Sequence, residues 1–280
     1  MSRMCNWFFM LSSRTRDSFY FLMTFVGLVS TFFTIFGVSL GDLLFPNIWM
    51  RLALVIFVLI ILYSFIYLLL GEIFSDSVHL CINGTSVHIS YGDIFEFSGW
   101  KVIGCDSHFD TRVDDRVISK NSLHGKMMLE HGTVSGICRA IDDEALRLKL
   151  SKNEDGLYDF PLGSIICYRN SCGETYLMLA MTELDDEFRA FTDMATFESM
   201  LMKMWIEIDR VYAGNQIVMP LLGTGISRFK DGFKKPETLL RCLLCTLNVS
   251  GVNLNSNVCI VIYDRSKKFP FYEYKHMFKI

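Results

Sequence analysis

The chain has 280 residues, of which 51% are hydrophobic, and its formal net charge is −3 at pH 7. This near-neutral balance, without a dense run of lysine or arginine, argues against nucleic acid as a partner. The nine cysteines are scattered, as is typical of a reducing compartment, and no second cysteine pair accompanies the motif Cys242-x-x-Cys245. That motif sits in an apolar helical pattern, which favours core packing over metal or redox chemistry. We therefore expect neither a metal nor a cofactor.

Two long stretches near the start of the chain carry no charged side chain. They cover residues 18–41 and 52–71, and about 20 apolar residues in a helix cross a hydrocarbon core of roughly 30 Å. We predict a transmembrane helical hairpin over residues 18–71, with a helix in a soluble core as the alternative for either stretch alone. Arginines in the leading segment 1–17 place that segment in the cytoplasm.

Small and hydroxyl side chains share one face of the first stretch. Thr24, Gly27, Thr31 and Thr34 recur at helical spacing, which is typical of a close helix–helix interface. This face is predicted to pack either on a second copy of the chain, in a homo-oligomer, or on the second stretch of the same chain.

Residues 72–280 are long enough for one soluble domain with a substantial core. The turn Asn83-Gly84 between two short apolar runs predicts a β-hairpin. The last third of the chain alternates between the two kinds of element: a helix over 196–212, a strand and glycine loop over 216–225, a helix over about 236–247 and a strand over 257–264. This alternation predicts parallel strands and an α/β fold.

The loop Gly223-Thr224-Gly225 follows a strongly apolar strand. Glycine has no Cβ, so the backbone of this loop can approach a ligand closely. The N–H groups of such a turn form a concavity that fits a phosphate, and Arg228 adds a cation three residues further on. Ligands of parallel sheets bind at the carboxyl ends of the strands, where this loop falls. The alternative is an ordinary strand-to-helix turn.

Three separated motifs resemble the macro domain, a family that binds ADP-ribose and related nucleotides. They are Gly92-Asp93-Ile94, Pro161-Leu162-Gly163 and Pro220-Leu221-Leu222-Gly223-Thr224-Gly225. The stretches 109–115 and 118–126, behind the two predicted spans, are similar to the membrane-anchored macro-domain effectors of type II Thoeris anti-phage defence. The resemblance implies a mixed sheet flanked by helices.

The resemblance also implies a function. A TIR-domain enzyme would make an ADP-ribose conjugate, in this branch histidine–ADP-ribose, and the macro domain would bind that signal. The protein would then form a homo-oligomer and disrupt the lipid bilayer, which aborts the infection. The implied location is the bacterial inner membrane, with several spans and a cytoplasmic macro domain. The alternatives are a membrane-tethered ADP-ribosyl hydrolase and a scaffold that has lost its ligand.

The family's binding residues carry over to matching positions. Asp93 matches the aspartate that accepts from the adenine amino group, although it also suits a cap of the next element. Gly223-Thr224-Gly225-Ile226 match the loop around the diphosphate and the distal ribose. Tyr263 or Asp264 falls where the family contacts the nucleoside, and a plain strand end is the alternative.

One departure from the family concerns turnover. Macro-domain hydrolases place an asparagine and a glycine run after the strand that corresponds to 101–105, and this chain lacks both. Binding is therefore favoured over catalysis, and we name no catalytic residue. Asp106, Asp110 or Asp114 is a candidate to hold the cationic end of a histidine-type ligand, with a solvated loop as the alternative.

The stretch 119–126 is interpreted as a lid over the ligand or a contact between protomers, and its histidine as a base or a structural residue. The ligand contacts predicted between the two nucleotide motifs are Asp106, Phe109, Asp110, Thr111, Ser119, Asn121, Ser122 and His124.

Overall fold

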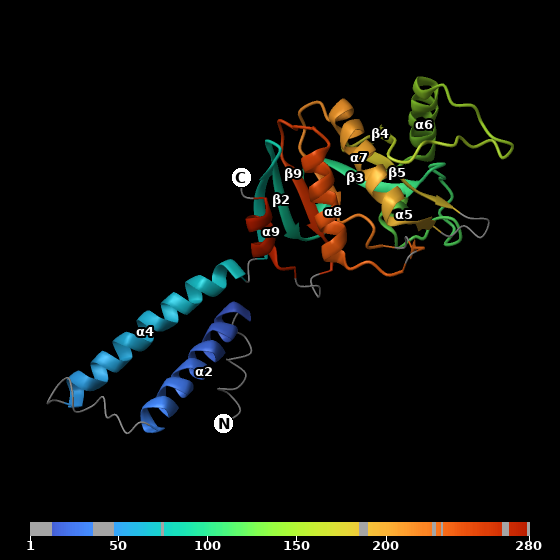
Figure 1. The fold of residues 1–280 in the computed structure, drawn as a ribbon. Coiled ribbons are helices and arrows are strands. Elements are labelled where there is room, and N and C mark those ends of the chain that lie inside the picture. The colour runs from blue at the N-terminus through green and yellow to red at the C-terminus, as the bar shows by residue number, and fades with distance from the viewer. Residues whose placement is uncertain are drawn as a thin grey trace. The chain divides into compact units, whose positions relative to one another are not determined.

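The structure is a computed structural model, and it describes residues 13–35, 48–73, 76–184, 190–225, 228–230, 232–264 and 269–278. The contacts divide the chain into two compact units (Figure 1). The first comprises the residues up to Asp76 together with Pro270–Glu273, and the second comprises Ser77–Phe269 together with the residues from Tyr274 onward.

The first unit contains two helices, α2 (Ser13–Ile35) and α4 (Ile48–Ile73), which pack side by side. Ser18, Leu22 and Ile66 are buried, while most of the other large apolar side chains described on these helices are exposed. Polar side chains on α4 are too few to form a continuous polar face, whereas α2 carries hydroxyl side chains among its apolar ones. The two helices alone therefore leave much apolar surface uncovered.

Within the described residues, no helix combines the length and the apolar character needed to span a bilayer. The predicted multi-pass location in the inner membrane is therefore wrong, and the transmembrane hairpin is not supported. The helix α2 covers only 18–35 of the first predicted span, because 36–41 lie outside the described residues, and it carries Arg14, Arg16 and Asp17 in its first turns.

The second unit is built on a mixed sheet, with nine strands in the described residues. Its order is β1-β2-β9-β7-β3-β5-β6-β8, and β4 pairs with β5 outside this path. The strands are β1 (Ser77–Ile82), β2 (Thr85–Tyr91), β3 (Trp100–Asp106), β4 (Ile165–Arg169), β5 (Thr175–Leu184), β6 (Ala190–Thr192), β7 (Ile217–Pro220), β8 (Arg228–Phe229) and β9 (Val258–Ile262).

The centre of the sheet is parallel. Pairing is parallel from β2 to β9, from β9 to β7, from β7 to β3 and from β3 to β5, so these strands end at one edge. At the far side, β1 and β2 form the predicted hairpin, in which Asn83 and Gly84 both have positive φ, 49° and 80°. Such φ values suit a two-residue hairpin turn. The predicted α/β fold with a mixed sheet is confirmed.

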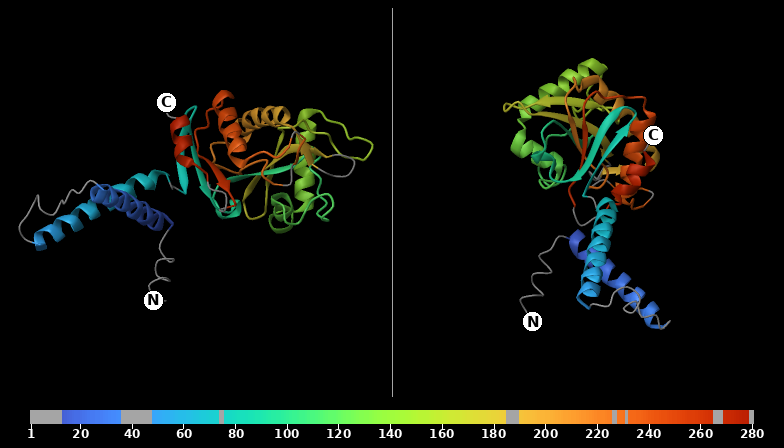
Figure 2. Two further views of the ribbon diagram at one scale, coloured as in Figure 1. Left: turned by 60° about the horizontal axis from the view of Figure 1, so that its bottom comes forward. Right: turned by 90° about the vertical axis from the view of Figure 1, so that its left-hand side faces the viewer.

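Helices cover both faces of the sheet (Figure 2). The short helices η1 (Ile94–Glu96), α5 (Leu123–Lys126) and the π-helix η2 (Met127–His131) lie on one side with α6 (Val134–Leu148). Helices α7 (Met194–Val211) and α8 (Pro236–Val249) cover the other side. The last helix is α9 (Phe271–Met277).

Sequence periodicity explains how α7 and α8 pack. Phe197, Leu201, Met204 and Ile208 recur at three and four residues and are all buried, and Trp205 donates from Nε1 to Oγ1 of Thr246 in α8 at 3.2 Å. The close approach of α7 also accounts for Gly163 in the second macro motif, which has φ +93°. A Cβ there would lie 2.5 Å from Cβ of Lys203.

The motif Cys242-x-x-Cys245 lies in α8 beside the buried leucines rather than among them. Cys242 is half-buried and Cys245 is exposed, so the predicted core packing of this pair is wrong. Burial, followed by the nearby carboxylate of Glu198, raises the pKa of Cys242 to about 12. At neutral pH this thiol is protonated and is a poor nucleophile.

Candidate ligand-binding site

The predicted site residues come from separate parts of the chain and meet where parallel strands end. Asp93 follows β2, Asp106 ends β3, the loop 221–225 follows β7, and Tyr263-Asp264 follow β9. Because these strands run in the same direction, their carboxyl ends share one edge of the sheet. The topology therefore brings the diphosphate-loop motif and the nucleoside motif together.

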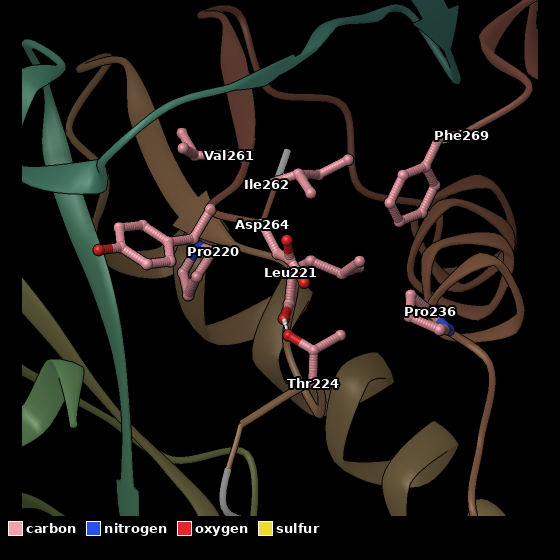
Figure 3. Close-up of a pocket in the computed structure, with 9 residues that line it drawn as sticks. Pro220, Leu221, Thr224, Pro236, Val261, Ile262, Asp264 and Phe269 are labelled. Atoms are coloured by element: carbon pink, nitrogen blue, oxygen red, sulfur yellow. Dashed lines mark hydrogen bonds between the residues drawn. The ribbon is translucent and has the colours of Figure 1, made fainter. Parts of the chain in front are cut away.

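A pocket opens at the ends of β7 and β9 (Figure 3). Its cavity volume is about 50 Å³, and its walls combine polar and apolar surface. Its lining residues are Pro220, Leu221, Thr224, Pro236, Val261, Ile262, Tyr263, Asp264 and Phe269. Thr224, Tyr263 and Asp264 were predicted from the sequence. Asp93 and the Asp106–His124 region do not line this pocket.

Several residues that line the pocket were not predicted from the sequence, and the neighbouring chain explains most of their positions. Pro220 and Leu221 belong to the loop motif itself, and Pro236 is the first residue of α8. Proline suits that first turn because its missing N–H would have no partner there. The helix dipole favours negative charge beside the pocket, although the N–H groups of Thr238 and Leu239 already donate to the carbonyl of Lys235. Phe269 follows residues 265–268, which the structure does not describe, and no sequence signal marks it.

The two loop glycines have different roles. Gly223 has φ +81°, and a Cβ there would come within 3.3 Å of Leu239 and Phe197, so it packs against α7 and α8. At Gly225 a Cβ would meet no atom of the described residues within 4 Å, so the backbone there faces open space within that part of the chain. Thr224 donates from Oγ1 to the carbonyl of Leu221 at 2.8 Å, which tightens the turn (Figure 3).

Two predicted contacts of this loop region lie beyond what the structure describes. Ile226 falls outside the described residues, and Arg228 lies in β8 with its side chain undescribed. Their roles remain predictions.

Asp93 caps η1. Its Oδ1 accepts from the N–H of Phe95 at 3.0 Å, so the capping role considered from the sequence is present. The cap uses Oδ1 alone, and the carboxylate is half-buried beside the end of β2. The assignment of Asp93 to an adenine amino group stays a prediction.

Asp106 shapes the turn that leaves β3. Its side chain is 7% exposed, and Oδ1 accepts from the N–H groups of His108 at 2.9 Å and Asp110 at 3.4 Å. This turn holds Phe109 at φ +51° and sends its ring into the core, edge-to-face on Phe160 with centroids 5.0 Å apart. Phe109 is 1% exposed and therefore acts as a core residue.

The negative charge of Asp110 is paired with a positive charge within its own loop. Both carboxylate oxygens accept from Nε of Arg112 at 3.0 Å, and Oδ1 also accepts from its N–H. Burial opposes ionisation, but the hydrogen bonds from Arg112 outweigh it and lower the pKa of Asp110. Asp114 is exposed and accepts from the N–H of Val117 at 2.8 Å. Asp114 therefore fits the alternative of a solvated loop. Thr111 is half-buried between these turns.

The segment 119–126 forms a tight capped turn. Ser122 donates from Oγ to the carbonyl of Ser119 at 2.7 Å and accepts from the N–H of Gly125 at 2.9 Å. The N–H of exposed Asn121 donates to Oγ of Ser119 at 3.3 Å. These hydroxyls hold the backbone in place, so most of their hydrogen-bonding capacity is used within the segment.

His124 is the unusual side chain of this segment. It is 6% exposed, and its Nε2 finds no hydrogen-bond partner among the described residues. Burial lowers the pKa of His124, while the carboxylates of Asp106 and Asp110 act in the opposite direction. A buried imidazole nitrogen without a partner is destabilising, so it marks a place where a ligand atom or water would be accommodated.

The helix α5, which carries His124, continues directly into η2. A polar cluster holds His131, the last residue of η2. Nδ1 of His131 lies 3.3 Å from Oε2 of Glu174, and Nζ of buried Lys101 lies 3.3 Å from Oε1. Tyr176 donates from its hydroxyl to Oε2 at 3.0 Å. The ring of His131 also stacks on Phe95, with centroids 4.9 Å apart. The cluster therefore joins η1, which Asp93 caps, to the segment of His124.

Replacing Glu174 with glutamine is expected to destabilise the protein by about 1–2 kcal/mol at pH 7, less than for a fully buried pair because Glu174 is 35% exposed. Burial raises the pKa of Glu174, but bonds from Tyr176, Asn170 and Lys101 bring it below its ordinary 4.5. A carboxylate whose pKa is lower in the folded state than in the unfolded state stabilises the fold at pH values above its unfolded-state pKa. This stabilisation is lost as the pH falls through its folded-state pKa. Denaturant unfolding should show the difference from wild type at pH 7.

That difference should shrink as the pH falls below about 4.5, because the wild-type carboxylate then also becomes neutral. Glu154→Gln, in an exposed turn, is the control and should match the stability of wild type both at pH 7 and below about pH 4.5. A deficit in Glu174→Gln that is equally large in acid would contradict the electrostatic explanation.

The mixed sheet, the helices on both its faces and the glycine loop at its carboxyl edge place the chain among the α/β nucleotide-binding folds, which include the macro domain. The family model of the macro domain of the Thoeris protein ThsA matches residues 87–263. The Thoeris protein ThsA of Bacillus amyloliquefaciens (strain Y2) is 32% identical over 233 residues, which cover 79% of this chain and 75% of that protein. The chain belongs to the Thoeris ThsA macro-domain family, which confirms this part of the predicted resemblance.

Solved structures of similar fold include the Oceanobacillus iheyensis macrodomain with ADP. It is 14% identical, covers 72% of this chain and 95% of its own, and superposes with a TM-score of 0.48. Thermosipho africanus DarTG in complex with ADP-ribose is 11% identical, covers 72% of this chain and 47% of its own, and has a TM-score of 0.45.

Proposed function

We propose that this chain is a nucleotide-signal receptor of Thoeris anti-phage defence, which binds an ADP-ribose-type ligand at the carboxyl edge of its sheet. The observation that carries the proposal is the open space at Gly225 beside the pocket between β7 and β9. A loop that is tightly packed at Gly223 but free at Gly225 leaves room for a group to approach its backbone.

The parts of the ligand are assigned by chemistry. The diphosphate lies against the backbone of the loop 221–225, near the start of α8, where the helix dipole favours anions. Tyr263, which is 73% exposed, offers a ring face for stacking on adenine. The free oxygen of Asp93 accepts from the adenine amino group.

The far end of the ligand is assigned to His124 and Asp106. The unpartnered Nε2 of His124 and the buried carboxylate of Asp106 suit a hydrogen-bonding, cationic group such as the histidine of histidine–ADP-ribose. Such a conjugate is the product of a TIR-domain enzyme. Asp110 is not part of this proposed subsite, because Arg112 already pairs with it.

The role is binding rather than turnover. The chain lacks the asparagine and the glycine run that macro-domain hydrolases place after the strand 101–105, and Oδ1 of Asp106 is engaged in its own turn. The ligand is instead a switch for homo-oligomerisation. The exposed apolar faces of α2 and α4 supply a surface of the kind that such assembly would bury.

Calorimetric titration of the full chain with ADP-ribose, and with its histidine conjugate, tests the proposal. Binding is expected, and mass spectrometry should recover the ligand unchanged. Asp93→Ser should weaken binding about tenfold through loss of one hydrogen bond to the base. Serine keeps the cap of η1 but is too short to reach the adenine.

Asp155→Ser, in an exposed turn, is the matched control and should bind as wild type does. Absence of binding to both ligands would refute the receptor function, and consumption of either ligand would refute the binding-only role.

A further inference from the structure

A lysine of the segment 119–126 contacts a residue that lines the pocket. Nζ of Lys126 lies 5.8 Å from the ring centroid of Tyr263, which lines the pocket and is 73% exposed. Lys126 is the last residue of α5, whereas Tyr263 follows β9. This cation–π contact therefore connects the segment 119–126 to the nucleoside end of the site.

The backbone of Lys126 is firmly held while its side chain is half-exposed. His124 and Met127, on either side, are buried, and a Cβ at Gly125 would lie 2.2 Å from the carbonyl oxygen of Ser119. The turn thus fixes where the lysine stem begins. Four flexible methylene groups then let the ammonium move between nearby partners.

The carboxylates around the site work against a diphosphate ligand, and a nearby cation would offset them. Asp264 lines the pocket, and Asp93 and Asp106 lie at the ends of the neighbouring strands. These carboxylates oppose the approach of a pyrophosphate group. Arg112 is already engaged with Asp110, so it does not offset this charge.

We propose that Lys126 is the residue that selects ligands carrying a diphosphate, an inference that rests on the proposed function. Without ligand, its ammonium covers one face of the Tyr263 ring. With ligand, the ammonium moves to the diphosphate and frees that ring face for the base. The exchange is favourable because a cation–π contact at an exposed site is weaker than a charge-assisted bond to phosphate.

The test is calorimetric titration of the full-length Lys126→Met variant with ADP-ribose and with adenosine. Affinity for ADP-ribose should fall about tenfold, whereas affinity for adenosine should stay within about twofold of wild type, because adenosine has no phosphate. Lys126→Arg keeps the charge and should retain most of the affinity. The deficit of the methionine variant should shrink at high salt, which screens the ammonium in the wild type.

Lys120→Met is the matched control. Lys120 belongs to the same loop, is exposed, and pairs with Asp115 at 3.1 Å, so its loss should leave both affinities unchanged. If wild type binds ADP-ribose and Lys126→Met binds it equally well, or loses adenosine by the same factor, the inference is overturned while the proposed function stands. If wild type binds no ADP-ribose, both are refuted.

Discussion

Replacing Gly225 with valine is expected to abolish ADP-ribose binding and to leave the fold intact. The position has no positive φ, and no atom of the described residues lies within 4 Å of an added Cβ, so the branched side chain enters space that the proposed ligand needs. Affinity should fall by about a hundredfold or more, since the diphosphate would lose its close contact with the backbone. Calorimetry with ADP-ribose measures the loss, and thermal unfolding should match wild type.

Gly225→Ala provides a graded comparison, because its single methyl group fills less of the same space. Its affinity should lie between those of wild type and the valine variant. Binding of wild-type strength in Gly225→Val would show that the diphosphate does not approach this loop. A large loss of thermal stability would show instead that the open space is part of the folded core.

Replacing Gly125 with alanine is expected to destabilise the protein by about 2 kcal/mol. Alanine normally favours a helix over glycine, but here its Cβ would lie 2.2 Å from the carbonyl oxygen of Ser119 and 3.0 Å from Cα of Lys120. Backbone atoms cannot rotate away as a flexible side chain can, so the turn that positions His124 must shift. Denaturant unfolding measures the free energy.

The control for this prediction is Gly225→Ala, which adds the same methyl group in open space and should cost about nothing in stability. A Gly125→Ala variant as stable as wild type, with ADP-ribose binding unchanged, would show that the segment 119–126 adapts readily. It would also show that the backbone before Lys126 is not rigid, and the role assigned to Lys126 depends on that rigidity.

Much of the fold was predictable because its signals are local. The apolar periodicity of Phe197, Leu201, Met204 and Ile208 predicted α7, and Asn83-Gly84 predicted the hairpin of β1 and β2. Each signal lies within one element and depends only on backbone preference or on which face is buried. The family motifs extended this prediction to a mixed sheet flanked by helices.

The site was harder to predict because its side chains choose between partners that sequence does not rank. Asp110 was expected to face a ligand but pairs with Arg112, two residues away. Phe109 was expected at the ligand but turns into the core at a positive φ. The contact of Lys126 with Tyr263 depends on the folding of distant segments onto one edge of the sheet.

The uncharged runs at the start of the chain were a poorer guide. They predicted two membrane spans, whereas no helix among the described residues is long and apolar enough to cross a bilayer. A run without charged side chains shows only that ionised groups are missing from it, and a helix in a soluble core can meet the same condition.

The π-helix η2 has a consequence for the length of the chain around it. A π turn holds one residue more than an α turn, and each residue of an α-helix rotates the chain by about 100°. Deleting one residue between Met127 and His131 would rewind this segment and swing the imidazole of His131 off Phe95. The number of residues in this stretch is therefore more constrained than their identity. An insertion or deletion here would separate η1 from the segment that carries His124.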